Sequence, residues 1–180
     1  RDFMKSTRIL GAILLMTILF GSVAAFGKTL VPSVTPASLK RLSGFGEGVA
    51  SKTLVKTLRQ EVALSGARPG ATYEMVWVLS KLDEKKTSRT VVKGTSLSPK
   101  ASPKGVLRLG ALPSGVLKAL PKKALAISAR APEGKSAARG RVGDYVLTVQ
   151  LKPKGQVEQP HLVLDVTLHV GMRPVWCPVC

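Results

Sequence analysis

The segment 65–80, SGARPGATYEMVWVLS, places a turn signal directly before a strand signal and decides the fold class. Gly66, Pro69 and Gly70 are residue types that supply the backbone conformations of tight turns. Tyr73 then opens a run in which apolar side chains recur at every second position around Trp77. This period of two is typical of an extended strand, so the segment predicts a chain reversal followed by a strand.

Both faces of the predicted strand carry apolar side chains. One face holds Tyr73, Met75, Trp77 and Leu79, and the other holds Glu74, Val76, Val78 and Ser80. A strand that is apolar on both faces is typical of the inside of a sheet rather than its edge. The charged segment 82–89 then predicts a hairpin loop, and 90–97 predicts the returning strand.

Short apolar segments separated by Gly- and Pro-rich turns continue to the end of the chain. Alternation predicts strands within 106–112, 124–130, 143–151 and 161–170, whereas 114–120 predicts a short helical turn. In the last strand the expected buried face is Leu162, Leu164, Val166, Leu168 and Val170. Many short strands with frequent turns predict an all-β sandwich.

The segment 49–64 has an ambiguous period. Leu54, Leu58 and Val62 are spaced four apart, as on a helix, but the intervening Thr and Val residues favour strands. We expect two short strands here, in keeping with the turn-rich surroundings.

The chain divides into four regions by composition. Residues 1–25 have a positive start, an uncharged run over 9–26 and small residues at 22–25, which predict a secretory signal peptide or an uncleaved membrane anchor. Residues 26–44 predict a linker, with one helical turn after Thr35 and Pro36. The sandwich domain is expected over 45–170, followed by a tail at 171–180. The sequence therefore predicts an extracytoplasmic protein, whether secreted, periplasmic or on the cell surface.

The segment 62–77, VALSGARPGATYEMVW, resembles a turn of immunoglobulin-like and fibronectin type III-like sandwiches. In those domains a tyrosine hydroxyl bonds back to upstream backbone, forming a tyrosine corner. Gly66, Pro69, Gly70, Tyr73 and Trp77 match this pattern. Residues 45–151 also resemble sandwich domains of secreted bacterial surface proteins. The resemblance implies an immunoglobulin-like fold and carries almost no chemistry.

The composition is strongly basic. Lys and Arg number 28 against 10 Asp and Glu, and the formal net charge is +18. Cleavage after residue 25 removes two net charges, which leaves +16. Such a surface attracts polyanions, and the expected partners are acidic envelope polymers or an acidic protein. Aromatic residues are too scarce, at 4%, for a base-stacking platform, so no specific nucleic acid is expected. The membrane is expected to be contacted only by residues 1–25, if they are uncleaved.

No residue constellation predicts catalysis, a metal or a cofactor. His161, Asp165 and His169 are spaced four apart, but on a strand this spacing spans about 13 Å, too far to share one ion. They are expected to be polar residues on the outward face. The chain also lacks the Gly-x-Ser-x-Gly signature of a nucleophile elbow.

Cys177 and Cys180 form a Cys-x-x-Cys pair. Outside the cytoplasm a local disulfide is the expected state of such a pair. The sequence thus predicts a non-catalytic structural or interaction module of the cell envelope. The alternative is an envelope redox or metal-handling protein that uses Cys177 and Cys180, together with His169.

Overall fold

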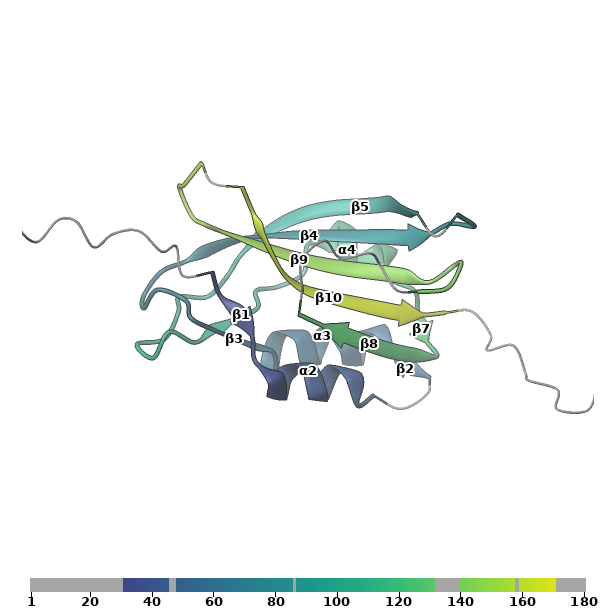
Figure 1. Ribbon diagram of the computed structural model, residues 1–180, viewed down its shortest axis with the longest axis horizontal. Coiled ribbons are helices and arrows are strands. Elements are labelled where there is room, and N and C mark those ends of the chain that lie inside the picture. The colour runs from purple at the N-terminus through teal and green to yellow at the C-terminus, as the bar shows by residue number, and fades with distance from the viewer. Residues whose placement is uncertain (1–30, 46–47, 86, 132–139, 158, 171–180) are drawn as a thin grey trace, which may run out of the picture.

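The computed structural model describes residues 31–45, 48–85, 87–131, 140–157 and 159–170. Its largest sheet is antiparallel, with strand order β5-β4-β9-β10-β8 (Figure 1). These strands are β4 (Tyr73–Leu82), β5 (Ser88–Leu97), β8 (Ala126–Arg130), β9 (Tyr145–Pro153) and β10 (His161–His169). The predicted mainly β, antiparallel character is confirmed. β4 has partners on both sides, as its two apolar faces predicted.

The remaining elements are shorter. The strands β1 (Ser33–Val34), β3 (Ala63–Ser65) and β6 (Leu107–Arg108) form one small sheet, and β2 (Val49–Ala50) pairs with β7 (Lys123–Ala124). Three helices accompany them in the described part: α2 (Pro36–Ser43), α3 (Ser51–Gln60) and α4 (Ser114–Ala119). α4 confirms the short helical turn predicted within 114–120.

Helix α2 begins where the sequence places a cap. The hydroxyl of Thr35 accepts a hydrogen bond from the backbone N–H of Ser38, and Pro36 occupies the first helical turn, where its missing N–H has no cost. Leu42 on the inner side of α2 is fully buried. Residues 33–43 of the predicted linker therefore form β1 and α2, and they belong to the folded core.

Helix α3 occupies most of 49–64, where two strands were expected; strands are found only at the two ends of that segment, in β2 and β3, so the prediction is wrong for 51–60. Leu54 and Leu58, one helical turn apart, are fully buried, which means that the four-residue spacing reported the true period. Packing of this apolar stripe outweighs the β propensity of Val55 and its β-branched neighbours, which is worth well under 1 kcal/mol per residue.

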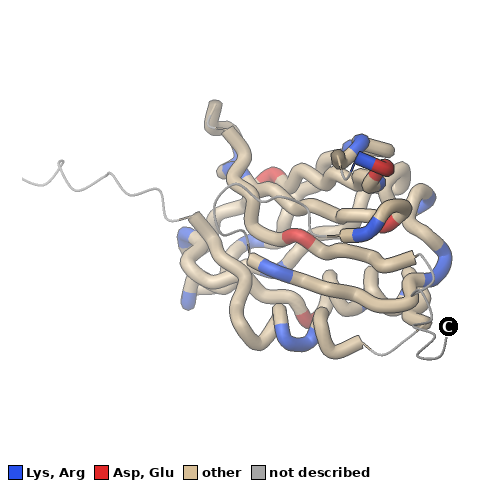
Figure 2. Tube along the Cα trace, turned by 45° about the vertical axis from the view of Figure 1, so that its right-hand side comes forward, with Lys and Arg blue, Asp and Glu red and all other residues tan. Residues whose placement is uncertain are grey.

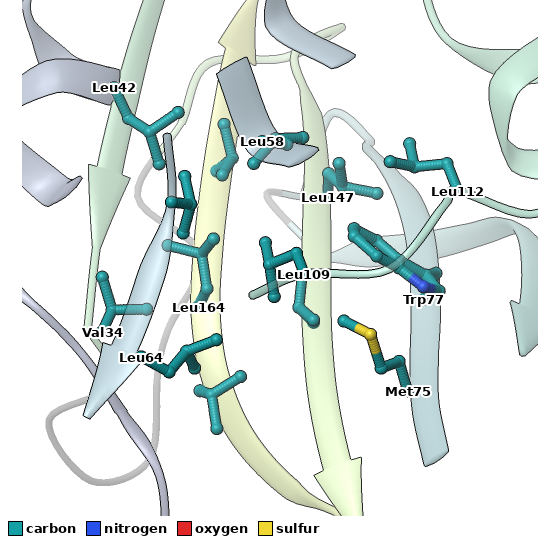
Figure 3. Packing of buried hydrophobic residues seen from close by; sticks show 14 of the residues in the cluster. Val34, Leu42, Leu58, Leu64, Met75, Trp77, Leu109, Leu112, Leu147 and Leu164 are labelled. Atoms are coloured by element: carbon teal, nitrogen blue, oxygen red, sulfur yellow. The ribbon is translucent and has the colours of Figure 1, made fainter. Parts of the chain in front are cut away.

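One face of the large sheet carries the core. Figure 3 shows Met75, Trp77, Leu147 and Leu164 of the sheet facing side chains from the helices, the small strands and the segment after β6. The contributors from the helices, the small strands and the segment after β6 include Val34, Leu42, Leu58, Leu64, Leu109 and Leu112. The layer opposite the large sheet thus consists of helices and short strands, where a sandwich has a second sheet of long strands.

The predicted face of β10 is only partly as expected. Leu164, Val166 and Leu168 are buried, but the pairing with β9 shifts between Leu162 and Leu164, which leaves Leu162 only half-buried. A bulge of this kind changes which side chains point inward on either side of it. Val170, which follows β10, is exposed, so alternation along the sequence gave the correct buried face only from Leu164 to Leu168.

The turn before β4 has the geometry its residues predict. Gly66 and Gly70 have φ of 83° and 71°, a region that glycine enters without steric cost. The hydroxyl of Tyr73 accepts a hydrogen bond from the backbone N–H of Arg68 at 3.0 Å. The backward hydroxyl contact implied by the resemblance is therefore present, and it ties the turn to the first residue of β4.

Candidate functional site

A groove lies between helix α3 and the segment that joins β5 to α4. It encloses about 620 Å³. The residues that line it are Lys52, Val55, Lys56, Arg59, Gln60, Leu97, Pro99, Arg108, Leu109, Gly110 and Ala111. Its walls therefore come from two parts of the chain that are far apart in sequence, and both contribute positive charge.

Helix α3 presents three of the cations on one face. Because Leu54 and Leu58 anchor the opposite side in the core, Lys52, Lys56 and Arg59 point outward and are exposed. The first and last of these positions are about 10 Å apart along the helix axis, at 1.5 Å per residue. The result is a row of positive charges that follows one wall of the groove.

Arg108 on β6 supplies the fourth cation from the other wall. Its guanidinium donates a hydrogen bond to the carbonyl of Gln60, in the last turn of α3. A cation at this end complements the helix dipole and satisfies a carbonyl that lacks an intrahelical partner. The contact also fixes the distance between the two walls.

The floor beside Arg108 depends on a close backbone approach. A Cβ atom on Gly110 would lie 2.3 Å from the carbonyl oxygen of Leu97, so only glycine fits here. The backbone N–H of Gly110 also approaches the sulfur of Met75 at 3.1 Å, which ties the floor to the core face of β4. Leu97 remains half exposed and adds an apolar strip to the groove.

The groove carries no compensating negative charge from the residues described as lining it. The ion pairs found among the described residues lie elsewhere, for example between Arg41 and Glu61 and between Lys152 and Glu74, each at 3.0 Å. Like charges four residues apart on a helix destabilise it by about 0.2–0.5 kcal/mol. Lys52 and Lys56 form such a pair, which an anion in the groove would relieve.

Basic residues also occur outside the groove. Figure 2 shows Lys and Arg positions on several sides of the molecule, with few acidic positions between them. The dispersed cationic surface read from the composition is therefore present. The groove differs from the rest of that surface because it combines a concave shape with four cations and no acid among its lining residues.

The residues of the predicted turn and of the strand after it make contacts within the fold. Trp77 is fully buried and donates from its indole nitrogen to the Ser96 hydroxyl at 2.8 Å. Tyr73 is also buried, and Gly66 and Gly70 lie in the turn itself. Pro69 occupies the same turn. None of these five residues lines the groove.

Asp165 and His169 lie on the outer face of the sheet, as expected, but neither is fully exposed. Asp165 is buried, and it accepts a hydrogen bond from the Thr148 hydroxyl at 2.9 Å. His169 is half-buried, and its Nδ1 lies 2.8 Å from Oδ2 of Asp144. Only His161 is exposed as expected. The outer face of a twisted sheet can thus bury polar groups once they are paired with one another.

Two predicted features lie outside the described residues: the signal or anchor segment 1–25 and the pair Cys177 and Cys180. Within the part of the chain that is described, no helix is long and apolar enough to cross a membrane. No group of three or more His, Cys, Asp and Glu in that part is placed to hold a metal ion.

The sequence carries one signal for the groove in the spacing of its cations. Lys52, Lys56 and Arg59 follow the helical spacing of four and three, and all three share a face only if 51–60 is a helix. In an extended strand Arg59 would lie on the face opposite Lys52 and Lys56. Arg108 gives no comparable signal, because its contact with Gln60 spans 48 positions.

No family model, no curated protein and no solved structure matches this chain. The groove and the side chains around it are therefore the basis for assigning a function.

Proposed function

We propose that the protein is an interaction module that binds anionic polymers in the groove between α3 and β6. The observation that carries this proposal is the convergence of Lys52, Lys56, Arg59 and Arg108 on one concavity without an acidic lining residue. Cations held on rigid elements bind a polyanion with little loss of backbone freedom. Binding also releases counterions from the polymer, which favours association at low salt.

The groove favours a polymer with regularly repeated phosphate, sulfate or carboxylate groups. Two turns of α3 set three cations along about 10 Å, so neighbouring charges of one polymer chain can engage them together. Leu97 and Val55 add apolar surface on which the uncharged parts of the repeat can rest. Because the cations are exposed, the attraction is screened by salt over a length of about 10 Å at 0.1 M.

This function fits a location outside the cytoplasm, which we propose from the N-terminal pattern of residues 4–25. Acidic polymers of the cell envelope are then the natural ligands. An acidic protein is the other class that would supply a similar row of negative charge, and competition between the two classes distinguishes them.

Retention on a heparin column tests the proposal. The groove variant Lys52→Gln/Lys56→Gln/Arg59→Gln should elute at clearly lower salt than the wild type. A matched variant, Lys85→Gln/Arg89→Gln/Lys93→Gln, removes the same charge from the β4–β5 hairpin and should elute near the wild type. Equal loss in the two variants would show that only net charge matters, and the groove would have no special role.

A further inference from the structure

Three side chains from separate elements meet at the outer face of the large sheet, away from the groove residues. Ser128 lies on β8, His169 ends β10, and Asp144 immediately precedes β9. The Ser128 hydroxyl is 3.0 Å from Nε2 of His169, and Nδ1 of the same imidazole is 2.8 Å from Oδ2 of Asp144. The imidazole thus bridges a hydroxyl and a carboxylate through its two nitrogens.

The carboxylate of Asp144 determines which nitrogen of the His169 imidazole carries the proton. An ionised carboxylate only accepts hydrogen bonds, so Nδ1 of His169 must carry the proton shared with Asp144. In the neutral ring Nε2 then holds a lone pair and accepts the proton of the Ser128 hydroxyl. This is the tautomer that a general base needs beside a serine nucleophile.

Asp144 is held rigidly for this role. It is 1% exposed, and its carboxylate accepts backbone N–H groups of Arg141 at 2.7 Å and Val170 at 3.1 Å. Its own carbonyl accepts the N–H of Leu82 at 2.9 Å, which anchors the residue to the end of β4. Three backbone N–H groups thus hold Asp144 in place. Its carboxylate in turn orients the imidazole of His169.

Exposure increases along the relay, from the buried Asp144 through the half-buried His169 to the exposed Ser128. The hydroxyl is therefore accessible to a molecule in solution. Because Ser128 is exposed, water can satisfy its hydroxyl. Burial therefore does not impose the contact between this hydroxyl and His169. Arg130 lies on the same face two residues further along β8, about 7 Å away along a strand. Its guanidinium is paired with the carboxylate of the buried Asp165 at 3.9 Å.

We propose that Ser128 is a nucleophile, activated by His169 and Asp144, that accepts acyl groups from carboxylic esters. Its oxygen attacks the ester carbonyl carbon while Nε2 of His169 takes the hydroxyl proton. The bond from that carbon to the alcohol oxygen then breaks, and His169 returns the proton to the departing alcohol. Water attacks the acyl-serine in the same way, releasing the carboxylic acid and restoring Ser128.

A fluorophosphonate probe and p-nitrophenyl acetate test this activity on the full chain. We expect the probe to label Ser128, as located by peptide mass spectrometry, and the ester to be hydrolysed with an initial burst. Ser128→Ala should abolish both signals. His169→Gln should slow labelling about 100- to 10,000-fold, the usual contribution of a general base. His161→Gln removes an exposed histidine from the same strand and should leave labelling unchanged.

A variant of Asp144 separates a relay from a passive contact. Asp144→Asn should slow labelling of a folded protein, as checked by circular dichroism. If Asp144→Asn unfolds, Ser128→Ala and His169→Gln still test the proposal, because these two positions are less buried. Absence of probe at Ser128 in folded wild type, or equal labelling of wild type and His169→Gln, would overturn the proposal.

Discussion

The hydroxyl of Tyr73 and the backbone N–H of Arg68 lie 3.0 Å apart, so the side chain that opens β4 closes the turn before it. The backbone of Tyr73 is held as well, because its N–H donates to the Ser98 hydroxyl at 2.9 Å. Its carbonyl accepts from the N–H of Ser98 at the same distance. These contacts fix where β4 begins and how it pairs with the segment after β5.

Tyr73→Phe should lower the free energy of unfolding by about 0.5–1.5 kcal/mol, the usual net worth of one hydrogen bond. The ring stays buried, so the loss reflects the hydroxyl and the unpaired N–H of Arg68. Urea denaturation measures the effect. An unchanged midpoint would show that the turn is held by its backbone alone.

Trp77→Ala should cost more, about 3–5 kcal/mol, because it removes a fully buried aromatic side chain from the middle of β4. Trp77→Phe keeps a ring and loses the bond to Ser96, so it should be intermediate. Denaturation curves for the two variants rank these contributions. If alanine costs no more than phenylalanine, Trp77 does not support the core.

The sequence predicted the β4–β5 hairpin well because alternation and turn residues are local signals. It failed for α3, where Val55 and Thr57 favour strands and only packing of Leu54 and Leu58 on the sheet decides for a helix. The packing energy comes from contacts between distant parts of the chain, so local propensity does not predict it.

The sites were harder to foresee than the strands. The contact between Arg108 and α3 arises when β6 pairs with β3, and this pairing is not visible in either segment alone. Ser128 and His169 meet across paired β8 and β10, 41 positions apart. Strand pairing therefore brings together the residues of both the groove and the Ser128–His169 contact.

The double variant Cys177→Ser/Cys180→Ser should unfold near the wild-type midpoint. A disulfide across two intervening residues closes a very short loop and removes little entropy from the unfolded chain. Thermal denaturation under oxidising conditions checks this expectation. Insulin reduction or stoichiometric zinc in the wild type, lost in the variant, would instead support the redox or metal-handling alternative.

Mapping where a polyanion binds tests the central claim most directly. Titration of 15N-labelled protein with short-chain polyphosphate at low salt should shift amide resonances of residues 52–60 and 108–111 first. The shifts should decline in the groove variant, persist in the Lys85, Arg89 and Lys93 control, and largely vanish at about 0.5 M salt, where screening shortens to about 4 Å. Shifts spread evenly over all basic segments, or centred on the β4–β5 hairpin, would contradict the account.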